Sequence, residues 1–378
     1  MGPLMFIKRP PSRTGLLLLV WLTIFASPCP ASAAEGPHIR WKNHFWGWQP
    51  FTRHEFSRPT LSKNYVLIGL QNGTFAALRR ADGSIAWKNK FGAGFSTQAA
   101  VGGGKVYAAD QHGMLHALHL RTGREIWSTQ LQSQVRAKPI YGKGLLFVQT
   151  LGDEVLALDA KTGKQRWTFS APPVGTLPMT IPASPVLQDG TLFASFASGV
   201  VFSARASDGQ IHWQRNLSTA ELAFTACASP VLTTKDLVVL QIGRGLFALD
   251  AKTGTPLWNR DHSQAYSLAA DAEKHTLYMG HWKEGIFAVD SEDGKTLWQR
   301  SLSSHTDAHY SELAIFGDWI LVGDSHSTLW AVNRKDGQSV QKIDPWTDWG
   351  GFPNTPTVRD ANAAVWSEHG TLYYLDIR

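Results

Sequence analysis

The sequence has few cysteines, few charged residues and no long apolar run outside its first residues. Cys29 and Cys227 are its only cysteines, which excludes a small scaffold stapled by disulfides. Charged residues make up only 17% of the 378 residues, while 16 Trp and 18 Phe can fill a large core. The chain is therefore globular, and its length fits two or three domains or one repeat-built unit.

The charge balance does not indicate a nucleic-acid partner. The formal charge of +6 includes Lys8, Arg9 and Arg13, and no acid precedes Glu35, so the remainder carries about +3. No Lys/Arg cluster accompanies this small excess, and a nucleic-acid interface needs one.

Residues 1–34 are typical of an export signal. A basic segment precedes the apolar run from Gly15 to Ala26, and small residues ending at Ala34 follow. We expect this leader to be removed, leaving 35–378 as a single exported mature domain. The leader is too short to span a membrane comfortably, and no later run approaches the roughly 20 apolar residues required.

Cys29 raises the question of a lipid anchor, because bacterial lipoprotein signals end in a small-residue box closed by a lipidated cysteine. Ala26, Ser27 and Pro28 precede it here. The box lacks its leucine, has a proline before the cysteine and is followed by an A-x-A site. We expect Cys29 to be discarded with the leader.

An internal repeat dominates the rest of the chain. An apolar pair is followed by a polar turn with glycine and, four residues later, by tryptophan. Successive turn glycines are 40, 40, 46, 45, 40 and 43 residues apart, from Gly83 to Gly337. The tryptophans are Trp87, Trp127, Trp167, Trp213, Trp258 and Trp298, and Gln341 stands in the seventh place.

The local pattern favours strands over helices as the repeat unit. Segments such as Tyr65–Ile68 and Gly144–Val148 are short, β-rich and bounded by turn residues, with no helix-length amphipathic window between them. In the first copy we expect strands over about Tyr65–Gly69, Thr74–Arg79 and Ile85–Asn89, plus an innermost strand of undefined limits. Four-stranded units of about 43 residues match the blades of a β-propeller.

The two ends of the chain complete the count of blades. Residues Ala363 to Asp376 carry the early strands of an eighth unit without its last strand, and Ile39–Asn43 resembles Ile85–Asn89 with no strands before it. We therefore predict an all-β, eight-bladed propeller closed by an N-terminal strand, which removes free sheet edges. Trp41 joins the other six tryptophans as a structural residue, packed between blades against the small Ala or Ser of the strand pair.

The repeat resembles the pyrroloquinoline-quinone-repeat propellers over about residues 38–378. The last repeats are most similar to the BamB family of outer-membrane β-barrel assembly factors: Leu321–Ser325, then Asp336-Gly337 without a tryptophan, then Gly370–Tyr373 near the end. This resemblance implies a non-enzymatic periplasmic scaffold that helps insert β-barrels into the outer membrane. It implies a barrel-assembly subunit as protein partner, and a monomer within a complex that is at most peripheral to the membrane.

An enzymatic alternative remains open, although several sequence features speak against it. Quinoprotein dehydrogenases of the superfamily resemble one another in a vicinal cysteine pair, a calcium site and a longer chain, and this mature sequence has one cysteine. We expect no cofactor. No Gly-x-Ser-x-Gly, Walker or His-Glu-x-x-His motif occurs. A third alternative is a secreted interaction propeller unrelated to outer-membrane assembly.

The histidines do not predict a metal site. His305 and His309 flank Asp307 at a spacing that joins ligands on a helix, but they fall in a loop between blades. His116 and His119 fall on opposite faces of a hairpin strand. Solvent-exposed histidines are the favoured interpretation for His305 and His309.

Enlarged connections between blades are the candidate binding loops, at about 46–58, 170–183, 217–228 and 344–354. The last contains Trp346 and Trp349, which either form an interface or pack over the closure point. In BamB-like proteins the partner surface is a Leu-x-Leu-Arg stretch and an Asp-x-Asp pair. By position these fall on Leu177, Met179 and Thr180, and on Thr225 and Cys227; the apolar pair is kept and the charges are not.

Overall fold

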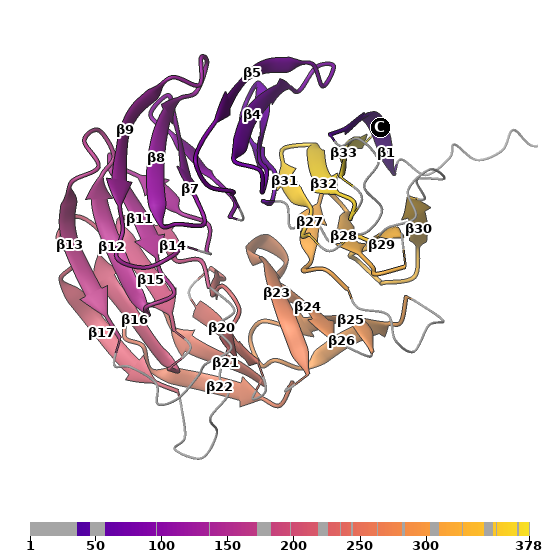
Figure 1. Ribbon diagram of the computed structural model, residues 1–378. Coiled ribbons are helices and arrows are strands. Elements are labelled where there is room, and N and C mark those ends of the chain that lie inside the picture. Colours follow the sequence, from indigo (N-terminus) through magenta and orange to yellow (C-terminus); the bar gives the residue numbers. More distant parts are fainter. Residues whose placement is uncertain are drawn as a thin grey trace, which may run out of the picture. The chain divides into compact units, whose positions relative to one another are not determined.

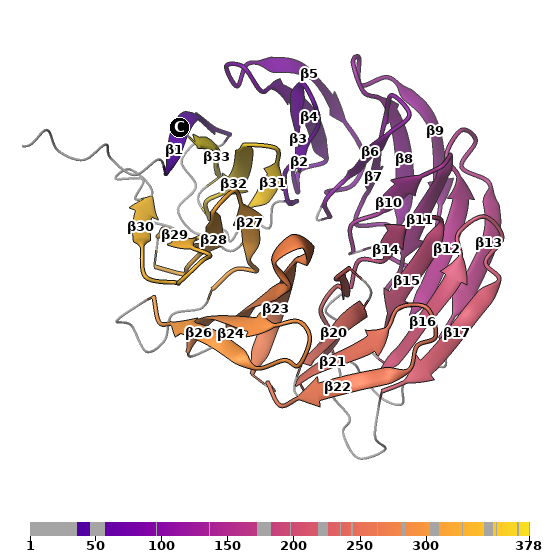
Figure 2. The same cartoon turned by 180° about the vertical axis from the view of Figure 1, so that it is seen from behind.

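A computed structural model describes residues 36–45, 57–343 and 351–377, except 96, 136, 172–182, 197, 218–225, 235, 243–244, 263, 282–283, 303–309, 327, 353 and 369. These residues form eight antiparallel sheets arranged as blades of a propeller (Figures 1 and 2). The prediction of an all-β, eight-bladed fold is confirmed. A 3-10 turn at Ala272–Lys274 interrupts the strands, and none of the described helical segments is long and apolar enough to span a membrane.

The first four blades follow one another along the chain. Each has four strands in sequence order, from the centre outward. Their bounds are β2 Thr60–Leu61, β3 Tyr65–Gly69, β4 Thr74–Arg79 and β5 Ile85–Lys90; β6 Ala100–Gly102, β7 Lys105–Ala109, β8 Met114–His119 and β9 Glu125–Gln130; β10 Ile140–Gly142, β11 Leu145–Gln149, β12 Glu154–Asp159 and β13 Gln165–Ser170; β14 Val186–Gln188, β15 Thr191–Ser195, β16 Val200–Arg205 and β17 Ile211–Asn216.

The remaining four blades vary this plan at two places. In blade 5 two short strands pair with β20, and in blade 8 the outer strand comes from the start of the propeller. The bounds are β18 Ala226–Cys227, β19 Val231–Leu232, β20 Asp236–Ile242, β21 Gly245–Asp250 and β22 Pro256–Arg260; β23 Ala265–Asp271, β24 Thr276–His281, β25 Gly285–Asp290 and β26 Thr296–Arg300; β27 Ala314–Phe316, β28 Trp319–Gly323, β29 Leu329–Asn333 and β30 Val340–Ile343; β31 Thr357–Arg359, β32 Asn362–Trp366, β33 Thr371–Ile377 and β1 Pro37–His44.

The repeat glycine is required by the turn between the third and fourth strands. Gly83 has φ of 74° and donates its N–H to the carbonyl of Arg79. Glycine adopts this conformation without the steric cost that a Cβ brings. A Cβ at Gly83 would also lie 2.9 Å from the Trp41 indole. Turn geometry and tryptophan packing therefore explain why glycine and tryptophan recur together.

The cores lie between neighbouring blades. The second and third strands are buried, and their apolar side chains form eight clusters, one at each junction between adjacent blades. The cluster between blades 8 and 1 includes Ile68 of β3 and Trp366 of β32, both with 0% exposed surface. This eighth cluster closes the ring.

The strand β1 completes blade 8, as the sequence predicts. It pairs antiparallel with β33 from Pro37 opposite Ile377 to His44 opposite Thr371. The indole of Trp41 stacks on Tyr374 with ring centroids 4.9 Å apart and donates to the carbonyl of Arg80 in blade 1 at 2.9 Å. These contacts link the outer strand to its own blade and to blade 1.

Backbone hydrogen bonds define two opposite faces of the propeller. On one face the turn between the first two strands of a blade meets the turn between its last two, as where Arg80 N–H donates to Asn64 O. We call this the turn face. On the other, the loop face, the middle turn meets the connection to the next blade, as where Phe91 N–H donates to Gly73 O.

Candidate functional site

The blade tryptophans are structural links between consecutive blades. Six of them lie opposite a small Ala or Ser of their own blade, as Trp87 lies opposite Ala77. For Trp41 the predicted small partner is wrong, because this residue lies opposite Tyr374. The indole also covers the turn glycine of the next blade: a Cβ on Gly123 would lie 2.5 Å from Trp87. Six indoles donate to a carbonyl of that next blade at 2.9–3.3 Å, namely those of Trp41, Trp87, Trp127, Trp167, Trp213 and Trp258. Trp298 packs in the same way over Gly337.

Most residues predicted to bind a partner fall outside the described residues. These are Leu177, Met179, Thr180, Thr225, Trp346 and Trp349. The backbone of Cys227 is described: it lies in β18 and pairs with Gln241 of β20. The residues that flank the undescribed connections lie on the loop face, where Ala171 N–H donates to Asp153 O and Leu217 N–H to Gly199 O.

One aromatic residue of the last enlarged connection is part of the core. Phe352 is 1% exposed and meets the Tyr373 ring edge-on, with centroids 5.7 Å apart. In the same blade, Phe45, which follows β1, meets Trp366 edge-on, with ring centroids 5.6 Å apart. For these two aromatics, packing near the closure is the observed role.

The histidine hairpin of blade 2 forms a small polar cluster in which His116 and Asp110 are buried and Glu125 is exposed. His116 Nδ1 lies 2.8 Å from Glu125 Oε2, and its Nε2 lies 3.6 Å from Asp110 Oδ2. Asp110 also accepts the backbone N–H groups of His112 and Met114, so it caps the turn. The stretch of His305, Asp307 and His309 lies outside the described residues. In the described part of the chain, no group of three or more His, Cys, Asp or Glu side chains is arranged to hold a metal ion.

Charged and polar groups gather where the loop-face connections enter the innermost strands. Arg58 pairs with Glu312 at 2.8 Å, and Thr355 donates to the same carboxylate at 3.3 Å. Lys138 stands at the corresponding position of blade 3 and is exposed at the surface. Partial desolvation by the surrounding protein, and then the charge of Arg58, lower the pKa of its ammonium. These groups can orient a polar ligand, but the described residues include no nucleophile held by a base there.

The same region is tied together from blade to blade. Ser184 Oγ accepts the N–H of Lys138, and Ser229 Oγ accepts the N–H of Ser184. These bonds hold the starts of the innermost strands in blades 3, 4 and 5 in register. In the sequence, the residues that make these bonds are recognised as a polar residue directly before a proline, a pair that occurs in each of these three blades.

Comparison with known proteins decides the family. The protein-family model described as outer membrane protein assembly factor BamB matches residues 71–299 of the sequence, more than half of the chain. The chain belongs to the BamB family. Among BamB proteins, that of Burkholderia pseudomallei is 24% identical over 332 residues, covering 85% of this chain and 84% of the relative. That of Escherichia coli K12 is 24% identical over 336 residues, covering 83% of each.

Solved structures show the same fold. BamB from Moraxella catarrhalis superposes with a TM-score of 0.74 at 17% identity, covering 90% of this chain and 100% of that one. A europium-containing methanol dehydrogenase superposes with a TM-score of 0.70 at 12% identity, covering 90% and 93%. The propeller is thus shared by assembly factors and by enzymes, and the predicted resemblance to BamB is confirmed by the family match.

Proposed function

We propose that this chain is a non-enzymatic periplasmic scaffold that assists the assembly of outer-membrane β-barrel proteins by holding a barrel-assembly subunit. The observation that carries the proposal is the BamB family match over residues 71–299. The relatives are named outer membrane protein assembly factors, and a rigid propeller suits a scaffold because its loops are presented on a fixed frame. In this proposal residues 1–34 direct export and 35–378 act in the periplasm.

The loop face is the proposed partner surface. The enlarged connections begin and end there, and the apolar Leu177 and Met179 stand in one of them. Thr180, Thr225 and Cys227 cannot supply the ion pairs that the family pattern would offer. Apolar contact or strand addition is the mode that these residues support, and such binding depends little on salt.

A double variant tests this surface. We expect Leu177→Asp with Met179→Asp to abolish co-purification of a barrel-assembly subunit while the melting temperature stays near that of the wild type. The matched control is Leu257→Asp with Leu297→Asp, because those side chains are 49% and 54% exposed on outer strands. Capture of the subunit at wild-type yield by the loop variant would refute the site. Loss of folding would place the two side chains in the core.

The absence of catalysis is the other part of the proposal. Of the two cysteines, only Cys227 lies in 35–378, so the vicinal pair of the quinoprotein dehydrogenases is lacking. The family match is to an assembly factor, whereas the likeness to a dehydrogenase concerns the fold. Both observations favour a binding function.

A further inference from the structure

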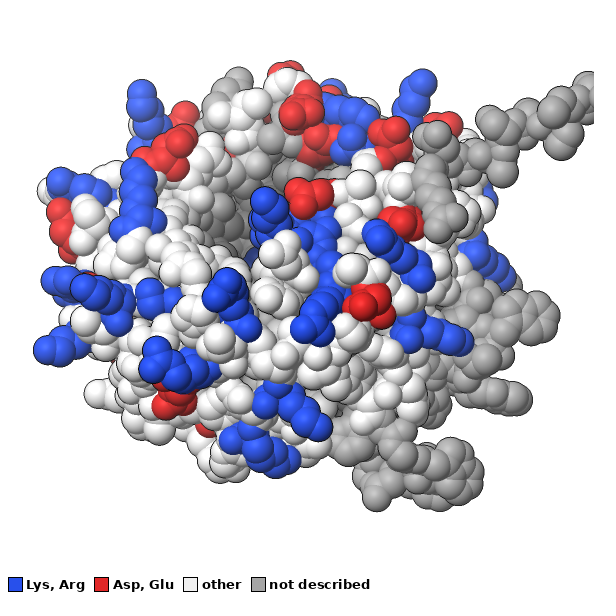
Figure 3. All heavy atoms as spheres, turned by 90° about the horizontal axis from the view of Figure 1, so that it is seen from above, with Lys and Arg blue, Asp and Glu red and all other residues white. Residues whose placement is uncertain are grey.

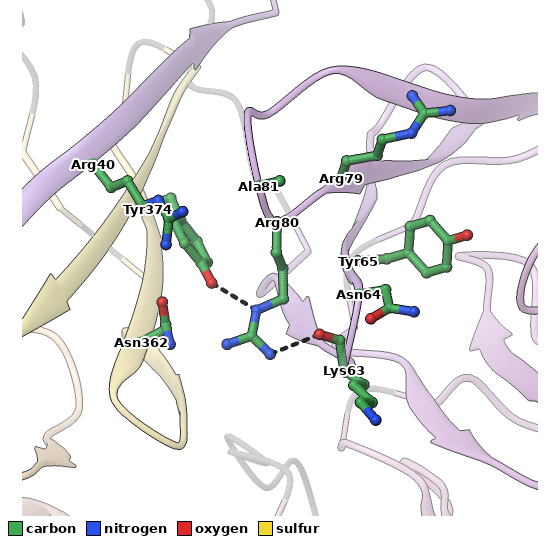
Figure 4. A pocket seen from close by; sticks show the side chains of 9 residues that line it. All are labelled: Arg40, Lys63, Asn64, Tyr65, Arg79, Arg80, Ala81, Asn362 and Tyr374. Atoms are coloured by element: carbon green, nitrogen blue, oxygen red, sulfur yellow. Dashed lines mark hydrogen bonds between the residues drawn. The ribbon is translucent and has the colours of Figure 1, made fainter.

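The seam between blades 8 and 1 contains a cationic pocket on the turn face. Its volume is about 500 Å³, and four of its nine lining residues are Arg40, Lys63, Arg79 and Arg80. None of the nine is acidic. In the view from above, several Lys and Arg side chains lie near the middle of the surface, with some Asp and Glu side chains among them (Figure 3). Figure 4 shows the side chains that line the pocket.

Arg40 is placed by an irregularity of the closing strand. Ile39 pairs with Leu375 and Trp41 pairs with Tyr374, so Arg40 is the extra residue of a β-bulge. Bulges redirect a side chain away from the regular alternation. The bulge position of blade 3 holds Arg166, whose guanidinium lies 2.6 Å from the carboxylate of Asp159. Arg40 makes no ion pair with any residue that the structure describes.

Arg80 is fixed at the base of the pocket. Its Nε donates to the hydroxyl of Tyr374 at 2.6 Å, and its Nη1 donates to the carbonyl of Lys63 at 3.1 Å (Figure 4). Nη1 also donates to the carbonyl of Ser62 at 2.9 Å. The side chain is only 13% exposed. Its carboxylate partner among the described residues is Asp360, 3.9 Å away, largely exposed and also 3.7 Å from Arg359.

In blade 7, the arginine at the position equivalent to Arg80 is paired with carboxylates. Arg334 corresponds to Arg80, since its N–H donates to the carbonyl of Asp318 as that of Arg80 donates to Asn64. The guanidinium of Arg334 lies 2.6 Å from the carboxylate of Asp271 and 3.7 Å from that of Asp318. It therefore has two counter-charges from two turns.

The seam lacks both of these acids. Asn64 stands at the position that Asp318 occupies in blade 7. Arg359 is the last residue of β31, as Asp271 is the last residue of β23, so a base stands where the second acid would be. A partly buried cation without good counter-charges is unfavourable, so the site gains from an anion taken from solution. Arg40 and Lys63 are exposed at the rim, where they can reach such an anion.

We propose that the seam pocket binds a phosphate-bearing anion of about the size of glycerol phosphate, free or as a lipid headgroup. Guanidinium groups match phosphate oxygens in geometry, and charge-assisted hydrogen bonds are the strong ones. The volume lies within the roughly 300–1,000 Å³ of small-ligand sites. The amides of Asn64 and Asn362 supply groups for the hydroxyls of the attached alcohol. The site is on the face opposite to the proposed partner loops, so it does not depend on the proposed function.

Calorimetry with glycerol 3-phosphate at low ionic strength tests the proposal on the mature protein. We expect Arg40→Gln with Lys63→Gln to weaken binding about tenfold or more, since each charge-assisted contact contributes strongly. The matched control is Arg166→Gln with Lys143→Gln, which removes the same charges from the corresponding positions of blade 3. We expect its affinity to stay within about twofold of wild type, with added salt weakening both.

Vesicles distinguish the two sources of the phosphate group. A lipid headgroup is the ligand if the protein sediments with phosphatidylglycerol vesicles but not with phosphatidylcholine vesicles, and if the Arg40→Gln and Lys63→Gln changes abolish this sedimentation. Binding of glycerol 3-phosphate without vesicle binding would assign a soluble phosphate ester. The proposal is overturned if the wild type binds neither probe, or if the seam variant and the blade 3 control weaken binding equally. The single variant Lys63→Gln, which leaves β1 unchanged, provides the same comparison should the double variant melt early.

Discussion

Trp41 offers the sharpest test of ring closure. If β1 is a structural part of blade 8, then replacing Trp41 by alanine must cost as much as replacing a tryptophan inside the repeat. Trp87 is the matched control, because it makes the same indole hydrogen bond to the next blade, to Leu120 O at 3.0 Å, and covers Gly123 as Trp41 covers Gly83. The two variants differ chiefly in the place of the tryptophan along the chain.

The size of the effect follows from what the side chain contacts. Trp41 stacks on Tyr374, covers Gly83 and satisfies the carbonyl of Arg80. Loss of such a side chain to alanine costs about 3–5 kcal/mol. Unfolding entropy of about 2.1 cal/mol/K per residue over roughly 340 residues is about 0.7 kcal/mol/K, so the melting temperature should fall by about 4–7 °C.

Differential scanning calorimetry of the mature protein measures both variants. Removal of residues 38–44 should lower the melting temperature further than Trp41→Ala, because β33 then exposes an unpaired edge. A melting temperature of Trp41→Ala within about 1 °C of wild type, beside a clear drop for Trp87→Ala, would refute closure by β1.

Two further predictions concern acid stability and metal content. The hydrogen bond from Arg166, then that from Thr162, lowers the pKa of Asp159 to about 2, below its usual 3.8. The ionised carboxylate therefore stabilises the fold above about pH 4, and this contribution is lost as pH falls toward 2. In urea unfolding, Arg166→Gln should lose less stability than wild type over that window; equal losses would contradict the pairing. The purified protein should contain no stoichiometric calcium, zinc or quinone, and chelation should leave its melting temperature unchanged; elemental analysis showing one metal ion per chain would refute this.

The blades were predictable because their turns make stereochemical demands. The turn requires a glycine because φ is positive there, as at Gly83, and the indole of the preceding blade packs on that glycine. Glycine and tryptophan therefore recur along the repeats. The innermost strands leave a weaker mark, the polar residue before proline in blades 3, 4 and 5. β2 has two residues, and the central edge of blade 5 is divided between β18 and β19. Strands this short are held by backbone pairing and show no alternation to detect.

The seam pocket could not be predicted from local patterns, since it depends on contacts across the whole propeller. Arg80 and Tyr374 are joined only when blade 8 closes on blade 1. A signal was nevertheless present in the repeats. Arg79-Arg80 stands where blade 3 has Asp159-Ala160 and blade 5 has Asp250-Ala251, so aligning the blades would have exposed the excess of charge.

The pairing of β1 with β33 also determines the order in which the protein can fold. Blades 1 to 7 each arise from one contiguous stretch, whereas blade 8 must join Pro37 to Ile377. Closing a loop of roughly 340 residues costs about 2 kcal/mol more in chain entropy than closing one of roughly 40. Contacts so distant in sequence form late. During synthesis from the N-terminus, β1 therefore has no partner strand while blades 1 to 7 form. The outer edge of β33 remains unpaired until β1 pairs with it.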